Sequence, residues 1–356
     1  MTLSPDAAVP DASAADASAA DASAADASAA DASAPDRSGT RLIRNPYLTV
    51  VQCTDDEVLL RHGARSRYSR VLRDDGRHRV LGPLLRAFAE PRLADDVVSR
   101  LADRADKEQL SGLIDQLADD GVLVAEHAGL HAMHRSLSEG RPVRRLEQTT
   151  VGLVGSGSVG AQLRTQLTEL GVGDVSAVAA GAGGLEAHDG DERLAGLLDG
   201  TDLLVLALDG FRPSLLHRLN RAAVAAGRPW LPVYADGSEL IVGPLVVPGE
   251  SACYNEHEIQ HESSRALRHE YQLYSEELAR RTADDLPPLL APYAAIAASW
   301  AAIGTARYLV DGASFLVGRA LRIDLERLEV TQEHVLRLPR CPVCTEQRPS
   351  FRHPFL

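Results

Sequence analysis

The amino-acid sequence predicts an α/β protein with two folded parts, a small winged-helix domain followed by a Rossmann-like domain. The first observation is the segment VGLVGSGSVG at residues 151–160, which is typical of a buried strand, a glycine turn and the start of a helix. The second is that strands and helices alternate after this segment. The third is that about 110 residues of other folded material, residues 41–150, precede it.

Residues 1–40 are expected to form a disordered tail. They repeat Asp-Ala-Ser-Ala five times at a spacing of five residues, beginning at Asp11. Such small side chains cannot offset the entropy lost on ordering. Seven aspartates in this tail contribute to the net charge of −13, so the remaining chain is only mildly acidic. This charge argues against general binding to nucleic acid or to anionic membranes.

The cysteine content and the N-terminal sequence predict a cytoplasmic protein. Four cysteines in 356 residues are too few for a disulfide scaffold, and no basic region followed by an apolar run suggests a secretory signal. Residues 286–306 carry no charge and are long enough to span a membrane. They are rich in alanine and open with Pro287 and Pro288, so we expect a tightly packed soluble helix and no membrane contact.

Residues 41–135 are expected to form the winged-helix domain, and residues 136–150 a polar linker. Strands are predicted over 47–52, 57–61 and 67–73, helices over about 80–89, 95–103 and 107–118, and a returning strand over 122–125. The third helix places four apolar residues on one face at i, i+3, i+4 and i+7, namely Leu110, Leu113, Ile114 and Leu117.

The charge pattern of this domain favours a peptide over DNA. The third helix offers Lys107 against several acids, which a phosphate backbone would repel: Asp106, Glu108, Asp115, Asp119 and Asp120. Arginines crowd the predicted hairpin instead, at positions 61, 65, 67, 70, 73, 77 and 79. A basic strand beside an apolar helix is suited to taking an extended acidic peptide as an added strand. A solvated arginine face and DNA binding remain alternatives.

From residue 151 the pattern predicts strands over 151–155, 174–179, 202–208 and 229–234, with helices over 159–170 and 213–226. A hairpin over 239–243 and 244–247, helices over 262–281 and 288–311, and strands near 319–325 and 328–336 follow. Pro232 predicts an irregular strand at 229–234. The second strand ends in Ala179 and Ala180, so it lacks the acid that a nicotinamide enzyme uses for the ribose.

Several motifs together carry a family resemblance. They are GVG at 171–173, LALDGF at 206–211, GRPW at 227–230, PGESACY at 248–254, APYAAIAASW at 291–300 and PRCPVC at 339–344. In this order and spacing, residues from about 150 to 348 resemble the ThiF family of adenylating enzymes, which are related to ubiquitin-activating proteins. The resemblance implies a Rossmann-like ThiF-type α/β domain over residues 151–356.

The chain departs from this family where ATP would bind. Ser158 replaces the second glycine of the paired glycines, and no Asp-x-Asp follows the second strand. The acidic loop at 186–192 would repel a triphosphate unless a metal lay between them. Four residues are therefore interpreted as a vestigial nucleotide loop, and we expect that this chain does not bind ATP: Gly155, Gly157, Gly160 and Asp209. Asp209 could equally be a turn residue at the end of a strand.

A structural zinc site is a further expectation. Cys341 and Cys344 form one half of such a site. The family supplies the other half from a CxxC, and here that segment reads CYNEH at 253–257. Three thiolates, from Cys253, Cys341 and Cys344, together with His257 or Glu256, could make four ligands. Free buried thiols are the alternative.

The order of the two domains resembles the leader-peptide-binding partner proteins of clusters that make azoline-containing peptides, the ocin-ThiF-like type. In that family the first domain is a RiPP recognition element (for ribosomally synthesised and post-translationally modified peptides), which takes up a precursor's leader as an extra strand. Carried over by position, the docking strand is Arg67, Tyr68, Ser69, Arg70, Val71 and Leu72. Leu110, Leu113, Ile114 and Leu117 would be divided between core and groove floor.

The resemblance implies a non-catalytic subunit that delivers the precursor to a separate YcaO-type ATP-dependent cyclodehydratase, which forms thiazolines or oxazolines. A homodimer remains open. Two alternatives also remain open: an active enzyme that adenylates a peptide carboxylate, and a winged-helix transcription regulator.

Overall fold

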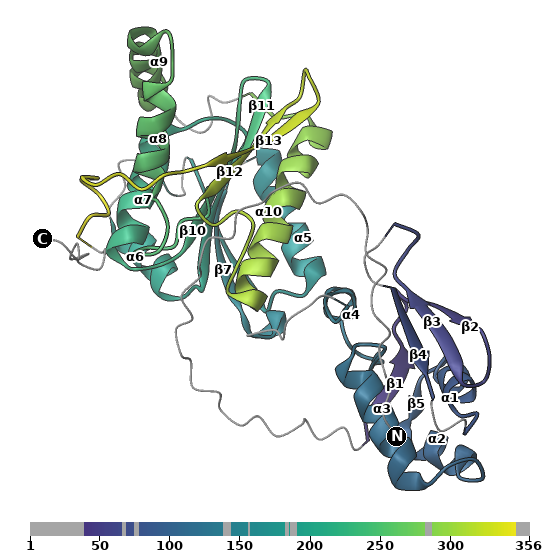
Figure 1. Cartoon of the computed structure of the whole chain (residues 1–356). Coiled ribbons are helices and arrows are strands. Elements are labelled where there is room, and N and C mark those ends of the chain that lie inside the picture. The colour runs from purple at the N-terminus through teal and green to yellow at the C-terminus, as the bar shows by residue number, and fades with distance from the viewer. Residues whose placement is uncertain are drawn as a thin grey trace, which may run out of the picture. The chain divides into compact units, whose positions relative to one another are not determined.

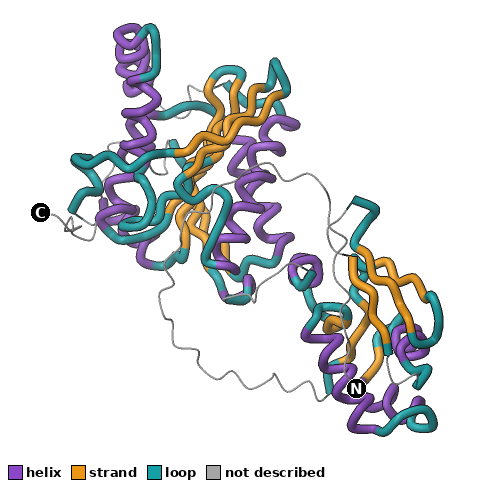
Figure 2. Tube along the Cα trace, in the orientation of Figure 1, coloured by secondary structure: helices purple, strands orange, loops and turns teal. Residues whose placement is uncertain are grey.

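The computed structural model describes residues 39–65, 69–74, 78–137, 144–155, 157–181, 185, 191–281 and 287–346. The chain divides into two compact units, Met1–Gly140 and Arg141–Leu356. The first holds two small antiparallel sheets and the second a seven-stranded mixed sheet (Figures 1 and 2). The predicted α/β architecture is confirmed. The predicted tail, except for Gly39 and Thr40, lies outside the described residues.

The first unit combines its two sheets with short helices. One sheet has the order β2-β3-β4 and the other the order β5-β1-β6. The strands are β1 (Arg41–Arg44), β2 (Thr49–Gln52), β3 (Glu57–Arg61), β4 (Ser69–Arg73), β5 (Arg92–Leu93) and β6 (Leu123–Ala125). The helices are α1 (Leu81–Ala87), α2 (Ala94–Leu101), α3 (Lys107–Asp119) and α4 (Leu130–Arg135).

The core of this unit follows from alternation in the strands and from one apolar helix face. Val58 and Leu60 on β3 and Leu72 on β4 are buried, as expected when every second side chain of a strand faces the core. The α3 helix ends before Gly121, which has a φ of 70°. A Cβ there would collide with the Ser136 carbonyl, so only glycine fits this turn.

The sheet of the second unit has the order β13-β12-β11-β10-β9-β7-β8. Parallel strands are β7 (Thr150–Gly155), β8 (Asp174–Ala179), β9 (Leu203–Leu208) and β10 (Trp230–Asp236). Antiparallel strands are β11 (Glu239–Val242), β12 (Arg319–Asp324) and β13 (Glu329–His334). Since β8 and β9 lie on opposite sides of β7, the strand order reverses there. Such a reversal is where open α/β sheets bind ligands.

Helices cover both faces of this sheet. One face packs against α5 (Gly157–Leu170) and α10 (Ala291–Asp311). The other packs against α6 (Asp191–Asp199), α7 (Pro213–Ala225) and the start of α8 (Tyr254–Ser263), while α9 (Arg268–Arg280) follows α8 (Figure 1). A 3₁₀ turn at Leu146–Gln148 precedes β7.

Buried alanines explain the charge-free stretch near residue 300. Ala294, Ala297, Ala298 and Ala301 on α10 are 0% exposed and face the core shared with α5. Their small side chains allow close packing. None of the described helices has the length and apolar character needed to cross a membrane.

Two sequence expectations for this sheet are wrong. The hairpin consists of β10 and β11, joined from Asp236 to Glu239, and residues 244–247 form only isolated bridges. The strand around Pro232 is regular and central. Its carbonyl accepts the Gly243 N–H just beyond the end of β11. The missing N–H therefore faces β11 and not β9, so the proline forgoes one bond at the end of the β10–β11 pairing and leaves the parallel ladder to β9 intact.

Candidate functional site

The glycine turn lies where the strand order reverses, between β7 and α5. Gly157 has a φ of 73°. Gly155 and Gly160 face each other: a Cβ built on either would lie 3.2–3.3 Å from the other's Cα. These two glycines therefore allow the helix to pack directly on the strand, as in nucleotide-binding folds.

Asp209, at the end of β9, occupies the N-terminus of α5. Its carboxylate accepts the backbone N–H groups of Ser158 and Val159, both at 2.8 Å, and of Leu289 at 3.2 Å. A side chain at Gly157 would collide with this carboxylate. A helix N-terminus binds phosphate through free N–H groups and a favourable dipole. Here a buried carboxylate of the chain itself already accepts two of those groups, the N–H groups of Ser158 and Val159.

Among the described residues, the end of the neighbouring strand offers no polar side chain for a ribose. Ala179 ends β8, and Ala180 follows it in an isolated bridge with Leu185. Most of the predicted acidic loop, residues 186–190, lies outside the described residues, and α6 begins at Asp191.

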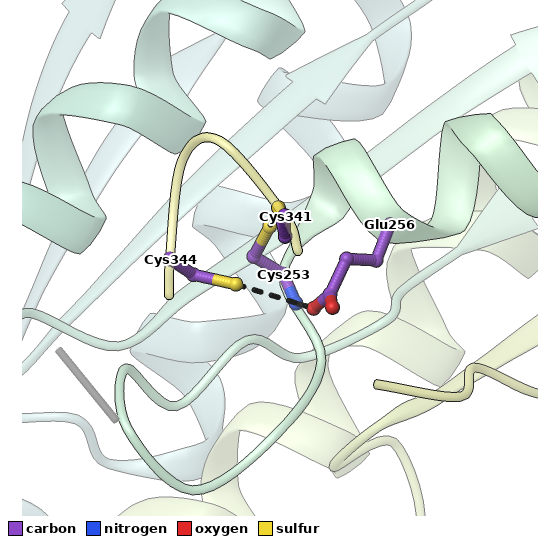
Figure 3. A group of neighbouring side chains, drawn as sticks. All are labelled: Cys253, Glu256, Cys341 and Cys344. Atoms are coloured by element: carbon purple, nitrogen blue, oxygen red, sulfur yellow. Dashed lines mark hydrogen bonds between the residues drawn. The ribbon is translucent and has the colours of Figure 1, made fainter. Parts of the chain in front are cut away.

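Three cysteines and a glutamate meet where α8 begins (Figure 3). The donor atoms of Cys253, Glu256, Cys341 and Cys344 all lie within 4.8 Å of one another, and all four residues are buried. The sulfurs of Cys253 and Cys341 are 3.6 Å apart, and the Cys344 sulfur lies 3.3 Å from Glu256 Oε2. Zn–S bonds of tetrahedral zinc place two thiolates about 3.8 Å apart. The group therefore could bind a metal such as zinc.

The electrostatics around Cys341 suit a thiolate. Burial by itself raises the pKa of Cys341, but the backbone N–H groups of Val343 and Cys344 and the Asn255 amide lower it below its usual value. Burial raises the pKa of Cys253 and of Cys344. One thiol is therefore prepared for deprotonation, while the other two would need a cation to hold them as thiolates.

The structure brings Glu256, and not His257, to the three sulfurs. Glu256 completes a capping box in which its Oε2 accepts the Cys253 N–H at 2.9 Å, and its other oxygen accepts the Leu338 N–H. His257 is buried away from this group, and its ring stacks on His261 at 5.9 Å. The signal for Glu256 was the spacing Cys-x-x-Glu, which matches both a CxxC and a capping box.

The β4 strand is an edge of its sheet, and the register with β3 shows which of its residues bond to β3. Glu57 pairs with Arg73, which sets Asp56 opposite Asp74. Asp74 donates its N–H to the Asp56 carbonyl at 2.8 Å, so these two form a hydrogen-bonded pair. Antiparallel pairs alternate between bonded and non-bonded. Leu72 and Arg70 therefore bond to β3.

The main-chain groups of Ser69, Val71 and Arg73 consequently point away from β3. No strand in the described part of the chain pairs with this side of β4. The main chains of Ser69 and Val71 therefore offer hydrogen-bonding groups to an added strand. Arg67 and Tyr68, which were predicted to extend the docking strand, lie outside the described residues.

The apolar face of α3 belongs to the core. Leu110, Leu113, Ile114 and Leu117 are all 3% exposed or less and pack with the other buried residues of the first unit. None of the four leaves an open surface for a groove floor. Asp120, at the C-terminal end of α3, contacts β4 instead: its carboxylate lies 3.1 Å from the Arg70 guanidinium.

No family model and no curated protein matches this sequence. Solved structures do match. The heterocyclase TruD superimposes with a TM-score of 0.62 at 19% identity over 86% of this chain and 43% of its own. A heterocyclase in complex with substrate and cofactor gives a TM-score of 0.61 at 19% identity over 86% and 39%.

The E. coli protein MccB matches with a TM-score of 0.52 at 15% identity over 88% of this chain and 99% of its own. Another structure of MccB, described as a microcin C7 biosynthetic enzyme, contains N-formylated MccA and matches with the same TM-score. This chain spans less than half of the heterocyclases and nearly all of MccB. The resemblance expected from the sequence is confirmed at the level of the fold: the chain shares the ThiF-like architecture of TruD and MccB over most of its length.

Proposed function

We propose that this chain binds the leader of a ribosomally made precursor peptide and delivers the precursor to a separate YcaO-type, ATP-dependent cyclodehydratase that forms azolines. The first unit acts as a winged-helix RiPP recognition element. The observation that carries the proposal is the outer edge of β4, where Ser69 and Val71 direct their main-chain groups away from β3. Main-chain bonds along such an edge supply affinity for an extended peptide.

The structural neighbours support a role in peptide modification. TruD is a heterocyclase, and MccB was solved with the peptide MccA. This chain spans 43% of TruD, and we assign the remaining part of a heterocyclase of that kind to the separate YcaO-type protein. Binding both components in one complex would raise the local concentration of the core peptide at the catalytic site.

A second candidate is adenylation of a peptide carboxylate, and the match to 99% of the MccB chain favours it. The carboxylate of Asp209 at the N-terminus of α5 argues against it. We therefore expect no ATP–pyrophosphate exchange by the purified chain, with or without peptide. Robust exchange above a Gly157→Asp control would favour the adenylation reaction. DNA binding has less support, because α3 exposes Asp115 and Asp119 to solvent.

We also propose that Cys253, Glu256, Cys341 and Cys344 hold a structural zinc ion. Elemental analysis of the purified chain should find about one zinc per chain, and removing it should destabilise the second unit by several kcal/mol. Cys344→Ser should lose most of the metal. Glu256→Cys should retain it, since a fourth thiolate at the same place completes a Cys₄ site. Metal-free protein with unchanged unfolding after chelation would contradict this assignment.

The proposed function is tested with the full chain and synthetic peptides. The peptides correspond to the N-terminal halves of short reading frames encoded next to this gene. At least one should bind in a fluorescence polarisation titration. A YcaO-type protein encoded nearby should then remove one water per azoline from the matching precursor only when this chain is present. Equal rates with and without this chain would contradict the proposal.

A further inference from the structure

We propose that Arg70 on β4 and Asp120 at the end of α3 form an exchangeable ion pair, and that a carboxylate of the incoming peptide replaces Asp120 on Arg70. The peptide would then carry Asp or Glu at the rung beside Arg70. This inference rests on the proposed function, because it assumes that a strand docks on β4.

The Arg70 side chain starts on the inner face of the β2-β3-β4 sheet. Arg70 alternates with the outward-facing Val71, and it shares its face with the buried Leu72. Its guanidinium reaches Asp120 at the C-terminal end of α3, with Nη2 and Oδ2 3.1 Å apart. The pair thus joins the edge strand β4 to the end of α3.

Asp120 is poorly placed for the stability of α3. A carboxylate at a helix C-terminus opposes the helix dipole, and Asp119 adds a second one. The two side chains are 32% and 28% exposed, so water screens their attraction. Ion pairs of this exposure contribute little to stability. Exchanging Asp120 for another carboxylate would therefore cost little.

The α3 surface in line with Asp120 leaves room for a peptide. Gly112, Gln116 and Asp120 follow one another at i, i+4 and i+8, so they share a side of the helix. A Cβ on Gly112 would meet no atom within 4 Å. An exposed glycine inside a helix is less favourable than alanine. Its presence in this row is explained if a backbone passes close to it.

The geometry of an added strand favours an acidic side chain at the peptide position opposite Arg70. A residue directly across from Arg70 would face the same side of the sheet, with Cβ atoms about 5 Å apart. A carboxylate there can take two of the five guanidinium donors. A lysine or arginine would meet Arg70 as a like charge, which is unfavourable between directly opposed residues.

The first test selects peptides of twelve random residues, displayed on phage, with the full chain and with the Arg70→Glu variant. The native chain should enrich one Asp or Glu, with an apolar residue two positions away, where it would lie near Leu72. Arg70→Glu should enrich Lys or Arg at the same position. Binders without any charge preference would refute the ion-pair exchange and leave the proposed function standing. Failure to select any binder would count against both.

The second test uses a selected acidic peptide made synthetically. Arg70→Ala should weaken its binding about fivefold, and Asp120→Asn should strengthen it about threefold. The matched control is Arg86→Ala, which removes another ion-paired arginine of the same unit. Opposite effects from the two partners of one ion pair cannot come from general destabilisation. If both substitutions weaken binding equally, the pair is structural and the inference is wrong.

Discussion

Val71→Pro on the β4 edge is expected to weaken peptide binding about tenfold or more while leaving the first unit folded. The Val71 N–H points away from β3, so proline removes no bond of the existing ladder. It does remove the central donor offered to an added strand, and one peptide carbonyl then loses its partner. A buried acceptor left unsatisfied costs about 1–3 kcal/mol, and 1.4 kcal/mol corresponds to tenfold in affinity.

The matched control is Gln52→Pro on β2, the other edge of the same sheet. The Cys53 N–H bonds to the Glu57 carbonyl, so the alternation directs the Gln52 main chain outward as well. Gln52→Pro should therefore bind peptide like the native chain. Circular dichroism and thermal unfolding of both variants should report an intact first unit. Equal loss of binding in the two variants would show that β4 has no special role.

Asp209→Ala is expected to destabilise the second unit by about 2–3 kcal/mol and to open the N-terminus of α5 to anions. The substitution leaves the N–H groups of Ser158, Val159 and Leu289 without their carboxylate. Losing a cap costs about 0.5–2 kcal/mol, and further orphaned donors add to this. Calorimetry should show that the second unit of Asp209→Ala unfolds at a lower temperature than that of the native chain. Millimolar phosphate or sulfate should partly restore this unfolding temperature.

The native chain provides the comparison for this effect. Phosphate should raise the unfolding temperature of the native chain far less than it raises the unfolding temperature of Asp209→Ala. The stabilisation of Asp209→Asn by phosphate should lie between those of the native chain and Asp209→Ala. An amide oxygen still accepts a hydrogen bond, but it brings no charge to the helix dipole. Equal stabilisation of the native chain and Asp209→Ala by phosphate would mean that the glycine turn is open to nucleotides.

The fold was predictable where periodicity extends over a whole element. The spacing of Leu110, Leu113, Ile114 and Leu117 predicted an α3 face that the structure buries. Short elements escaped, among them β5 with two residues and α4 with six, because so few positions define no period. The apolar run at 239–247 was wrongly divided, because a buried strand and a buried extended segment have the same composition.

The sequence predicted which types of residue form the candidate sites, but not which of them contact one another. Spacing selected Cys253, Cys341 and Cys344, yet the choice between Glu256 and His257 depended on which side of α8 faces the sulfurs. Adjacent residues on a helix point about 100° apart, and no pattern in the sequence states that direction. The bond from Leu289 to Asp209 joins residues 80 positions apart, and only the tertiary fold reveals it.

Amide hydrogen exchange, measured residue by residue on the full chain with and without a bound leader peptide, tests peptide capture on β4 most directly. Strand addition predicts that the amides of Ser69 and Val71 become protected on binding, while those of Arg70 and Leu72, already bonded to β3, change little. Protection confined to the glycine turn at residues 155–160, or an unchanged β4, would contradict it.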